Sequence, residues 1–488
     1  IWKIIMNNKE SIHMSINEFK ENGYKVIDWI ADYYENIESY PVLSQVNPGD
    51  LRKALPKKPP KKGDKFDSIL DEMNNTIIPG VTHWQSPNFF AYFPCNSTGP
   101  AILGDLLSSG LGIQGMLWAS SPACTELESH VLDWLVDMLH LPKKFKSTSS
   151  GGGVIQDTAS SATLCALIAA REKISNGKIN ESGFDNSIRV YTSKEAHSSI
   201  EKAIKIAGIG RKNLRLIKVD NNFAMDPIKL REAINQDINN NKTPAFVCAT
   251  VGTTSSTAID PLKEIGKICD EFGLWLHVDA AMAGSASICP EYQFIHEGIE
   301  YADSYCFNPH KFLLTNFDCS CLYVSNRQAL INSLTINPEY LKTEVSNSDT
   351  VFDYRDWQIP LGRKFRSLKL WSVIKYYGID GIQSHVRQHI SSAKLLSELI
   401  IKEEKFEIMA PTILNLVCFR YKGSDHFNKT LLEELNSSGK IYLVHTKLNN
   451  IYTLRFSIGQ TNTTKDHVLN GWKFILKKTE ELERNGIK

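Results

Sequence analysis

Between about residues 100 and 380, short apolar and β-branched runs alternate with stretches of helical periodicity, which restricts the fold more than any other feature. The candidate strands are SIRVYTS, LRLIKVD, AFVCATVG, LWLHVDAA and DSYCFNPHK, and helical patterns such as PIKLREAINQD lie between them. Strands that alternate with helices form βαβ units and a mainly parallel sheet. Strands as apolar as FVCAT are expected where helices cover both faces. The sequence therefore predicts an α/β fold with a mainly parallel central sheet covered by helices.

The chain on either side of this region follows other patterns. Residues 1–13 are expected to be a poorly ordered or non-native extension. In residues 14–99, SINEFKENGYKVIDWIADYYENI has one apolar stripe and predicts an amphipathic helix that packs on another domain or another subunit. We expect the large domain at residues 100–384 and a small C-terminal α+β domain at residues 385–488.

Composition and spacing argue against several classes of function. A formal charge of +1 over 488 residues, without a long basic stripe, argues against nucleic-acid binding. No apolar run approaches the roughly 18 residues that a membrane span needs. Ten cysteines without CxxC pairs, many of them in apolar runs, are typical of reduced thiols and predict a cytoplasmic protein. Cys319 and Cys321 have the wrong spacing for zinc, so no metal site is expected.

Lys311 lies in DSYCFNPHKFLLTNFDCS, where aromatic and aliphatic neighbours predict burial. A lysine usually keeps its ammonium group in water, so the simplest interpretation is a side chain that extends to the surface. The alternative is chemical, because a desolvated lysine amine is a nucleophile towards a carbonyl group.

Three further motifs fall at the ends of predicted strands, where sheets of this class bind ligands. SSGGGVIQDTASS places three glycines and then Thr158, Ala159 and Ser160 before a helix, where free N–H groups can hold a phosphate. Asp279 ends an apolar strand, and His197 lies between a strand and a helix. Taken singly, each has an ordinary explanation: a serine N-cap, a carboxylate bonded to backbone, or a surface imidazole.

Together these motifs supply a phosphate cradle, an anion, a flat ring and a nucleophilic amine. An anion beside a pyridine nitrogen keeps that ring protonated and electron-withdrawing. A lysine can form a Schiff base with an aldehyde. The combination fits pyridoxal 5'-phosphate as a cofactor, and it explains why Lys311 has apolar neighbours.

The chain also resembles the group II pyridoxal phosphate-dependent decarboxylases of fold type I, and among them the aromatic L-amino acid decarboxylases. The resemblance runs from about residue 14 to the C-terminus. It rests on PGVTHWQSPNFFAYFP, SPACTELE, GGGVIQDTAS, AHSS, HVDAA, NPHK, NFDCS and DWQIPLGRKFRSLKLW. It implies a homodimer with interlocked N-terminal helices and active sites at the subunit interface.

The resemblance implies roles for individual residues. Lys311 would be the Schiff-base lysine, Asp279 the partner of the pyridine nitrogen and His197 the ring-stacking residue. Further cofactor contacts are implied for Thr158, Ala159, Ser160, Thr253, Ala281, Asn308 and His310. Substrate contacts are implied for Trp84, Tyr92, Phe93, Pro94, Gln114, Met116 and Gly362.

Decarboxylation leaves a carbanionic intermediate that needs a proton, and Tyr354 in VFDYRDWQIP is the expected donor. Free tyrosine has a pKa of about 10 and is protonated at neutral pH. The polar segment around it, residues 344–357, is expected to be mobile, and the resemblance implies that a neighbouring subunit contributes it. Related enzymes with Phe at this position, or Asn in place of the stacking His, tend to form aldehydes.

The expected reaction is decarboxylation of tryptophan, phenylalanine, tyrosine or DOPA to the arylalkylamine and CO2. Gly362 leaves room for a large ring, whereas Phe312 and Met282 depart from the animal enzymes, as do Gln114 and Met116, so the preferred substrate stays open. An oxygen-consuming aromatic aldehyde synthase is the alternative. A non-catalytic dimeric scaffold is the third hypothesis.

Overall fold

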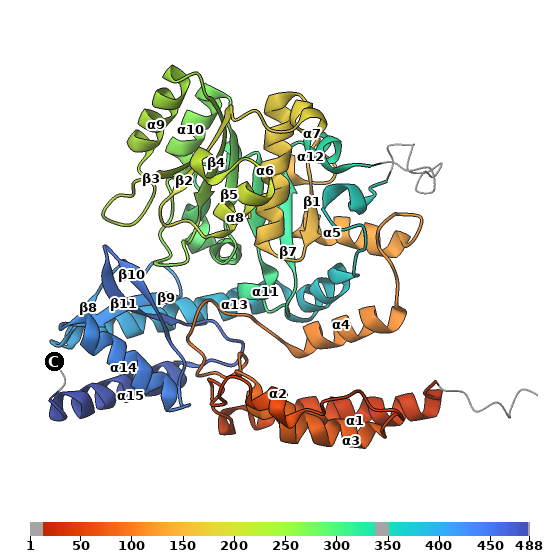
Figure 1. Ribbon diagram of the computed structural model, residues 1–488, viewed down its shortest axis with the longest axis vertical. Helices are drawn as coiled ribbons and strands as arrows, with labels where there is room; N and C mark the ends of the chain where they lie inside the picture. The colour runs from red at the N-terminus through yellow and green to blue at the C-terminus, as the bar shows by residue number, and fades with distance from the viewer. Residues whose placement is uncertain (1–12, 337–350, 487–488) are drawn as a thin grey trace, which may run out of the picture.

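The computed structural model describes residues 13–336 and 351–486, and it contains two β-sheets and an N-terminal helical arm (Figure 1). The arm consists of α1 (Ile16–Glu35), α2 (Asp50–Ala54) and α3 (Phe66–Glu72), which lie along the lower edge of the view. Ser15 and Glu18 form a capping box that begins α1. No residue of α1 is fully buried, so the predicted amphipathic helix is present with its apolar stripe only partly covered in this chain.

The larger sheet has seven strands in the order β1-β7-β6-β5-β4-β2-β3. The strands are β1 (Gly152–Gln156), β2 (Ile188–Ser193), β3 (Leu214–Ile217), β4 (Thr243–Thr250), β5 (Trp275–Asp279), β6 (Ser304–Phe307) and β7 (Ser320–Val324). The five from β6 to β3 are parallel, and β7 runs antiparallel to both β6 and β1. The predicted mainly parallel sheet is confirmed, and the antiparallel β1–β7 edge is an addition to it.

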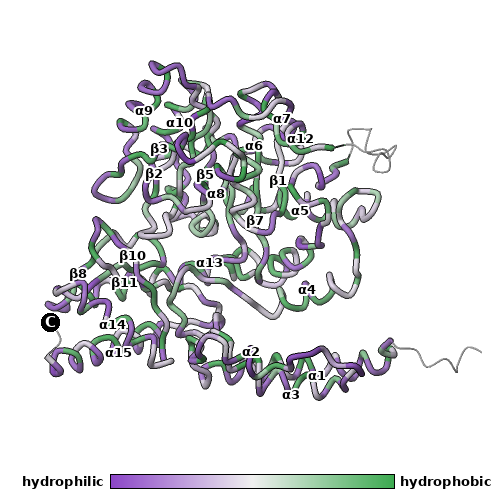
Figure 2. The backbone as a smooth tube through the Cα atoms, in the orientation of Figure 1, coloured by the Kyte–Doolittle hydropathy of each residue, from purple (hydrophilic) through white to green (hydrophobic). Residues whose placement is uncertain are grey.

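Helices cover both faces of this sheet. They are α4 (Gly99–Leu111), α5 (Pro122–Met138), α6 (Ala159–Ser175), α7 (Lys178–Ser182), α8 (Ser199–Ile206), α9 (Pro227–Asn239), α10 (Leu262–Phe272), α11 (Pro309–Phe312) and α12 (Arg327–Leu334). Helix α6 packs with α8 and α12 over one face, and α5, α9 and α10 contribute to the other. In α10 the buried Leu262, Ile265 and Cys269 recur at helical spacing and point to the sheet. Figure 2 shows the apolar strands inside and polar residues on outer helices such as α9.

The smaller sheet is antiparallel, with the order β10-β11-β9-β8. Its elements are β8 (Phe406–Ile408), β9 (Leu416–Tyr421), α14 (Asp425–Ser437), β10 (Val444–Leu448), β11 (Ile451–Ser457) and α15 (Lys465–Arg484). The long helix α13 (Arg366–Lys402) connects it to the larger sheet and has a non-helical residue at Gly378. The boundary expected between residues 384 and 385 therefore lies inside a continuous stretch of helix. Within the described residues, no helix has both the length and the apolar character needed to cross a membrane.

Candidate active site

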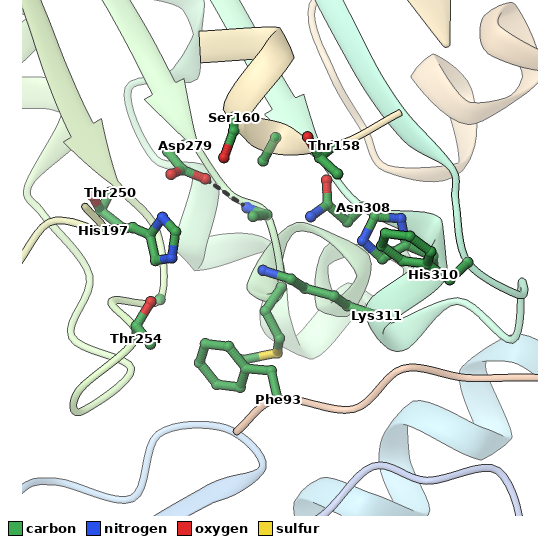
Figure 3. A pocket seen from close by; sticks show the side chains of 15 residues that line it. Phe93, Thr158, Ser160, His197, Thr250, Thr254, Asp279, Asn308, His310 and Lys311 are labelled. Carbon is green, nitrogen blue, oxygen red and sulfur yellow. Dashed lines mark hydrogen bonds between the residues drawn. The ribbon is translucent and has the colours of Figure 1, made fainter. Parts of the chain in front are cut away.

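The motif residues meet in a cavity of about 250 Å³ at the carboxyl ends of the central parallel strands (Figure 3). Thr250 ends β4 and Asp279 ends β5, while Asn308 follows β6 directly. We call this the inner cavity. An outer cavity of about 570 Å³ adjoins it, because Lys311, His197 and Phe93 line both. The location agrees with the rule that parallel sheets bind ligands beyond the carboxyl ends of their strands.

Lys311 lies on the single turn α11, and its amine points into the inner cavity between Asp279 and Phe93 (Figure 3). Its Nζ lies 5.6 Å from the centroid of the Phe93 ring. Burial lowers the pKa of Lys311, while the Asp279 carboxylate acts in the opposite direction. The side chain therefore ends in the cavity rather than at the outer surface, and its environment favours the neutral, nucleophilic amine.

Asp279 is 6% exposed and turns its carboxylate to the cavity. Its Oδ1 accepts a hydrogen bond from the Ala281 N–H at 3.0 Å and another from the Cys306 thiol at 3.7 Å. Among the described residues, no donor to its Oδ2 is present. A bonded carboxylate with one open oxygen suits a cationic ring nitrogen as its partner.

The N-terminus of α6 forms the phosphate-sized end of the inner cavity, where Thr158, Ala159 and Ser160 line the wall. Thr158 is the N-cap residue, but its side chain makes no capping hydrogen bond, so the first N–H groups of this long helix face the cavity. Asn308 also lines this cavity, and the N–H groups of its side-chain amide can donate to a phosphate oxygen. An uncapped helix start beside an amide donor fits a bound phosphate.

The three glycines before this helix, residues 151–153, make room for neighbouring atoms of the sheet and do not bring the backbone to a ligand. They open β1 and line neither cavity. A Cβ on Gly151 would lie 2.1 Å from the Lys144 carbonyl oxygen, and one on Gly153 would lie 2.7 Å from the Tyr323 ring. The expectation that these glycines let the backbone approach a ligand is wrong, because they make room for neighbouring strand and side-chain atoms.

Two histidines lie beside Lys311. The Nδ1 of His197 accepts from the Ser199 N–H at 3.1 Å, which leaves Nε2 to carry the proton of the neutral ring. Although His197 is open to the cavities, the surrounding protein lowers its pKa, mainly by desolvation. His310 accepts from the Cys319 N–H at 2.9 Å, and burial, with Lys311 adding, lowers its pKa to about 3. Both rings are neutral at pH 7.

Thr253 does not line either cavity, whereas Gly252 and Thr254 on either side of it do. Its hydroxyl lies 3.1 Å from the Ser256 hydroxyl and accepts from the Ala258 N–H at 3.1 Å. Thr253 therefore shapes the loop that carries its neighbours. Ala281 and Met282 line the inner cavity.

Aromatic side chains dominate the outer cavity. Trp84, Tyr92, Phe93 and Pro94, which were predicted to contact substrate, all line it. Trp84 and Tyr92 stack with ring centroids 5.5 Å apart, and the Tyr92 hydroxyl lies 3.2 Å from that of Tyr442. The lining also includes Cys95, Thr254, Phe317 and Arg455, which the sequence reasoning missed. The signal that the sequence offered was Arg455, a charged residue within the otherwise apolar stretch that forms β11.

Gln114, Met116 and Gly362 lie together elsewhere and line neither cavity of this chain. The Oε1 of Gln114 accepts from the Arg363 N–H at 2.6 Å, and a Cβ on Gly362 would lie 3.1 Å from the Gln114 Nε2. Their predicted contact with substrate thus has no support within one chain.

Tyr354 differs most from its predicted setting. It begins a short 3-10 turn, Tyr354–Trp357, and is 2% exposed. Its hydroxyl lies 2.8 Å from the Ser129 hydroxyl, and the Arg363 guanidinium lies 5.0 Å from its ring centroid. Burial raises its pKa. Aromatic and charged side chains enclose Tyr354 away from both cavities of this chain, so the segment expected to be mobile is packed at this residue. Its role as proton donor stays a prediction, since the resemblance implies that a neighbouring subunit contributes it; residues 344–350 of the expected segment lie outside the described residues.

Comparisons with known proteins agree with this cavity. Residues 48–422 match the model of the pyridoxal-dependent decarboxylase conserved domain. Tryptophan decarboxylase 2 of Oryza sativa subsp. japonica is 48% identical over 471 residues, which cover 95% of this chain and 94% of that protein. Phenylacetaldehyde synthase of Arabidopsis thaliana is also 48% identical, over 95% of this chain and 96% of that protein.

Solved structures show the same fold. Oryza sativa TDC with PLP and tryptamine superposes with a TM-score of 0.93 at 40% identity, over 96% of this chain and 99% of that one. Catharanthus roseus tryptophan decarboxylase in complex with L-tryptophan gives a TM-score of 0.91 at 44% identity with the same coverage. The chain has the fold type I architecture, belongs to the pyridoxal-dependent decarboxylase family and uses pyridoxal phosphate as its cofactor.

Proposed function

We propose that this chain decarboxylates aromatic L-amino acids to arylalkylamines and CO2. The observation that carries the proposal is the position of the Lys311 amine, between a cavity that fits the cofactor and a cavity with aromatic walls. A large cavity with aromatic walls suits an aromatic side chain.

The residues of the inner cavity account for each part of the cofactor. The N-terminus of α6 would hold the phosphate, Asp279 the ring nitrogen and Lys311 the aldehyde carbon, with His197 against the ring. When bound, pyridoxal phosphate supplies an electron-accepting ring for the bond that breaks. The protein selects the reaction by holding the substrate so that its Cα–carboxylate bond stands perpendicular to that ring. Lys311 and His197 carry protons within the cavity.

Formation of an aldehyde is the second candidate, because similarity alone does not separate the two reactions. Phenylacetaldehyde synthase of Arabidopsis thaliana and tryptophan decarboxylase 2 of Oryza sativa subsp. japonica are both 48% identical to this chain. The presence of His197 in both cavities favours the amine, since related enzymes with Asn at the stacking position tend towards aldehydes.

We further propose a homodimer in which a second copy covers the outer cavity. Three aromatic residues of its wall are open in one chain, with Trp84 38%, Tyr92 47% and Phe317 58% exposed. The leucines of α4, including Leu103 and Leu107, are also exposed, next to the partly covered stripe of α1. Such contiguous apolar surface is typical of a subunit interface.

A cytoplasmic location is part of the proposal. All ten cysteines are free, and nine of them are buried. Free, buried thiols are usual in a reducing compartment.

The test is a product analysis with purified protein, added pyridoxal phosphate and an equimolar mixture of tryptophan, phenylalanine, tyrosine, DOPA and histidine. We expect aromatic amines without hydrogen peroxide, and no product from the Lys311→Ala variant, whose folding is checked by circular dichroism. Aldehydes with stoichiometric peroxide would establish the synthase instead. Absence of any product from the cofactor-loaded protein would favour the non-catalytic scaffold.

A further inference from the structure

A row of buried polar groups lies behind Asp279, on the side away from the cavity. Trp275 and His277 belong to β5, whereas Ser304 and Cys306 belong to the adjacent strand β6. The parallel register places His277 opposite Ser304 and Asp279 opposite Cys306. These four residues, which lie behind the Asp279 carboxylate, are each at most 3% exposed. Their polar atoms therefore depend on one another for hydrogen bonds.

The first bonds in this row determine the tautomer of His277. The Trp275 indole N–H donates to the Ser304 hydroxyl oxygen at 2.7 Å, and that oxygen lies 2.8 Å from Nδ1 of His277. An indole nitrogen can only donate, so the Ser304 hydroxyl is free to donate its own hydrogen to Nδ1. Burial lowers the pKa of His277 to about 4, and the neutral ring then carries its hydrogen on Nε2.

The next bonds lead to the carboxylate. Nε2 of His277 lies 3.7 Å from the Cys306 sulfur, which lies 3.7 Å from Oδ1 of Asp279. Burial, with the negative charge of Asp279 adding, raises the pKa of the Cys306 thiol. The sulfur therefore keeps its hydrogen, accepts from His277 and donates to Asp279. Each group in the row donates towards the carboxylate.

We propose that His277 and Cys306 are positioning residues that keep Asp279 ionised and direct its Oδ2 into the inner cavity. The inference rests on the proposed placement of the cofactor's ring nitrogen at Asp279. A carboxylate buried without donors favours its protonated form. Donation to Oδ1 offsets that tendency, so the shared proton stays on the ring nitrogen, where it makes the ring a better electron acceptor.

Cys248 provides a matched control. It is a buried thiol on β4, the strand on the other side of β5, and it is close enough for the charge of Asp279 to raise its pKa. Its sulfur makes no hydrogen bond to the carboxylate within the described residues. Replacement of Cys248 or Cys306 by alanine removes one buried sulfur, but only the second removes a donor to Asp279.

The experiment uses the full chain with pyridoxal phosphate labelled with 15N at the ring nitrogen, so its readout does not depend on turnover. The 15N chemical shift reports protonation of that nitrogen, and quenching of tryptophan fluorescence gives the dissociation constant of the cofactor. For Cys306→Ala we expect a shift towards the neutral pyridine position and a dissociation constant about 3- to 10-fold higher, the range that the net contribution of one ordinary hydrogen bond gives. Cys306→Ser, which keeps a donor, should recover part of both effects, and Cys248→Ala should match the wild type.

The outcomes separate this inference from the function on which it rests. If Cys306→Ala weakens cofactor binding but leaves the 15N shift unchanged, Cys306 only packs and the inference is refuted. The same holds if Cys306→Ala and Cys248→Ala behave alike while Asp279→Asn moves the shift. If Asp279→Asn also leaves the shift unchanged, the placement of the ring nitrogen at Asp279 is wrong.

Discussion

Replacement of Tyr354 by phenylalanine tests the largest difference between the expected and the observed site. The change removes a hydroxyl that lies 2.8 Å from the Ser129 hydroxyl and keeps a ring that packs against Trp357 and Phe352. Ser129 still donates to the Thr125 carbonyl oxygen at 3.1 Å, so no buried polar group loses its only partner. We therefore expect the free energy of unfolding to fall by about 1 kcal/mol, the net contribution of one hydrogen bond. Tyr354 lines neither cavity of its own chain, so it can act as the predicted proton donor only at the cavity of a second copy. If it does, Tyr354→Phe should lose amine formation while cofactor binding is retained.

Two measurements check this expectation. Urea denaturation followed by circular dichroism gives the stability of Tyr354→Phe, Ser129→Ala and the double variant, whose effects should be non-additive because both remove the same bond. Product analysis on the same preparations gives the amine output. Unchanged amine output in Tyr354→Phe would mean that the proton donor lies elsewhere, and an unchanged free energy of unfolding would refute the reasoning from burial.

Two further substitutions test the surroundings of the site. His389 is buried with Nε2 3.1 Å from the Thr463 carbonyl oxygen, and burial lowers its pKa to about 4. The unfolded chain therefore binds this proton more tightly, and the stability that His389 contributes above pH 6.5 is lost as the pH falls towards 4. His389→Gln keeps an N–H donor but does not titrate. Between pH 7 and pH 5, its free energy of unfolding should therefore fall by about 2 kcal/mol less than that of the wild type, as measured by urea denaturation. Equal falls in the two proteins would contradict the burial of a neutral ring. Gly252 has φ +83°, and a Cβ there would lie 2.5 Å from the Ala283 Cβ. Gly252→Ala should therefore displace the loop that lines the inner cavity and weaken cofactor binding at least tenfold, as measured by fluorescence titration. Unchanged affinity would mean that the loop does not support the cofactor.

Much of the fold was predictable because its signals are local. The strands β2 to β6 were recognised from short apolar and β-branched runs, of which β2, β5 and β6 are buried throughout, and α1 from its single stripe. The antiparallel β1–β7 edge was not, since GGVIQ has little β-propensity and depends on its partner strand for its register. The boundary expected at residues 384 and 385 falls within α13, because this helix, kinked at Gly378, serves both sheets.

The sequence by itself determined the inventory of the site. Lys311, Asp279, His197 and the start of α6 follow strands of a parallel sheet, and the carboxyl ends of such strands meet at one edge. Their residue types then restrict the chemistry to an amine, an anion and a phosphate cradle, which is why motif and order sufficed to predict the cofactor.

Only the tertiary structure decided which residues share a cavity. Tyr354 belongs to a segment predicted to be mobile, yet it is buried, and its hydroxyl lies against that of Ser129, which is far away in the sequence. The thiol of Cys306 reads as core, yet strand register places it against Asp279. Burial and hydrogen-bond partners depend on contacts between segments far apart in the chain, and local patterns carry no information about them.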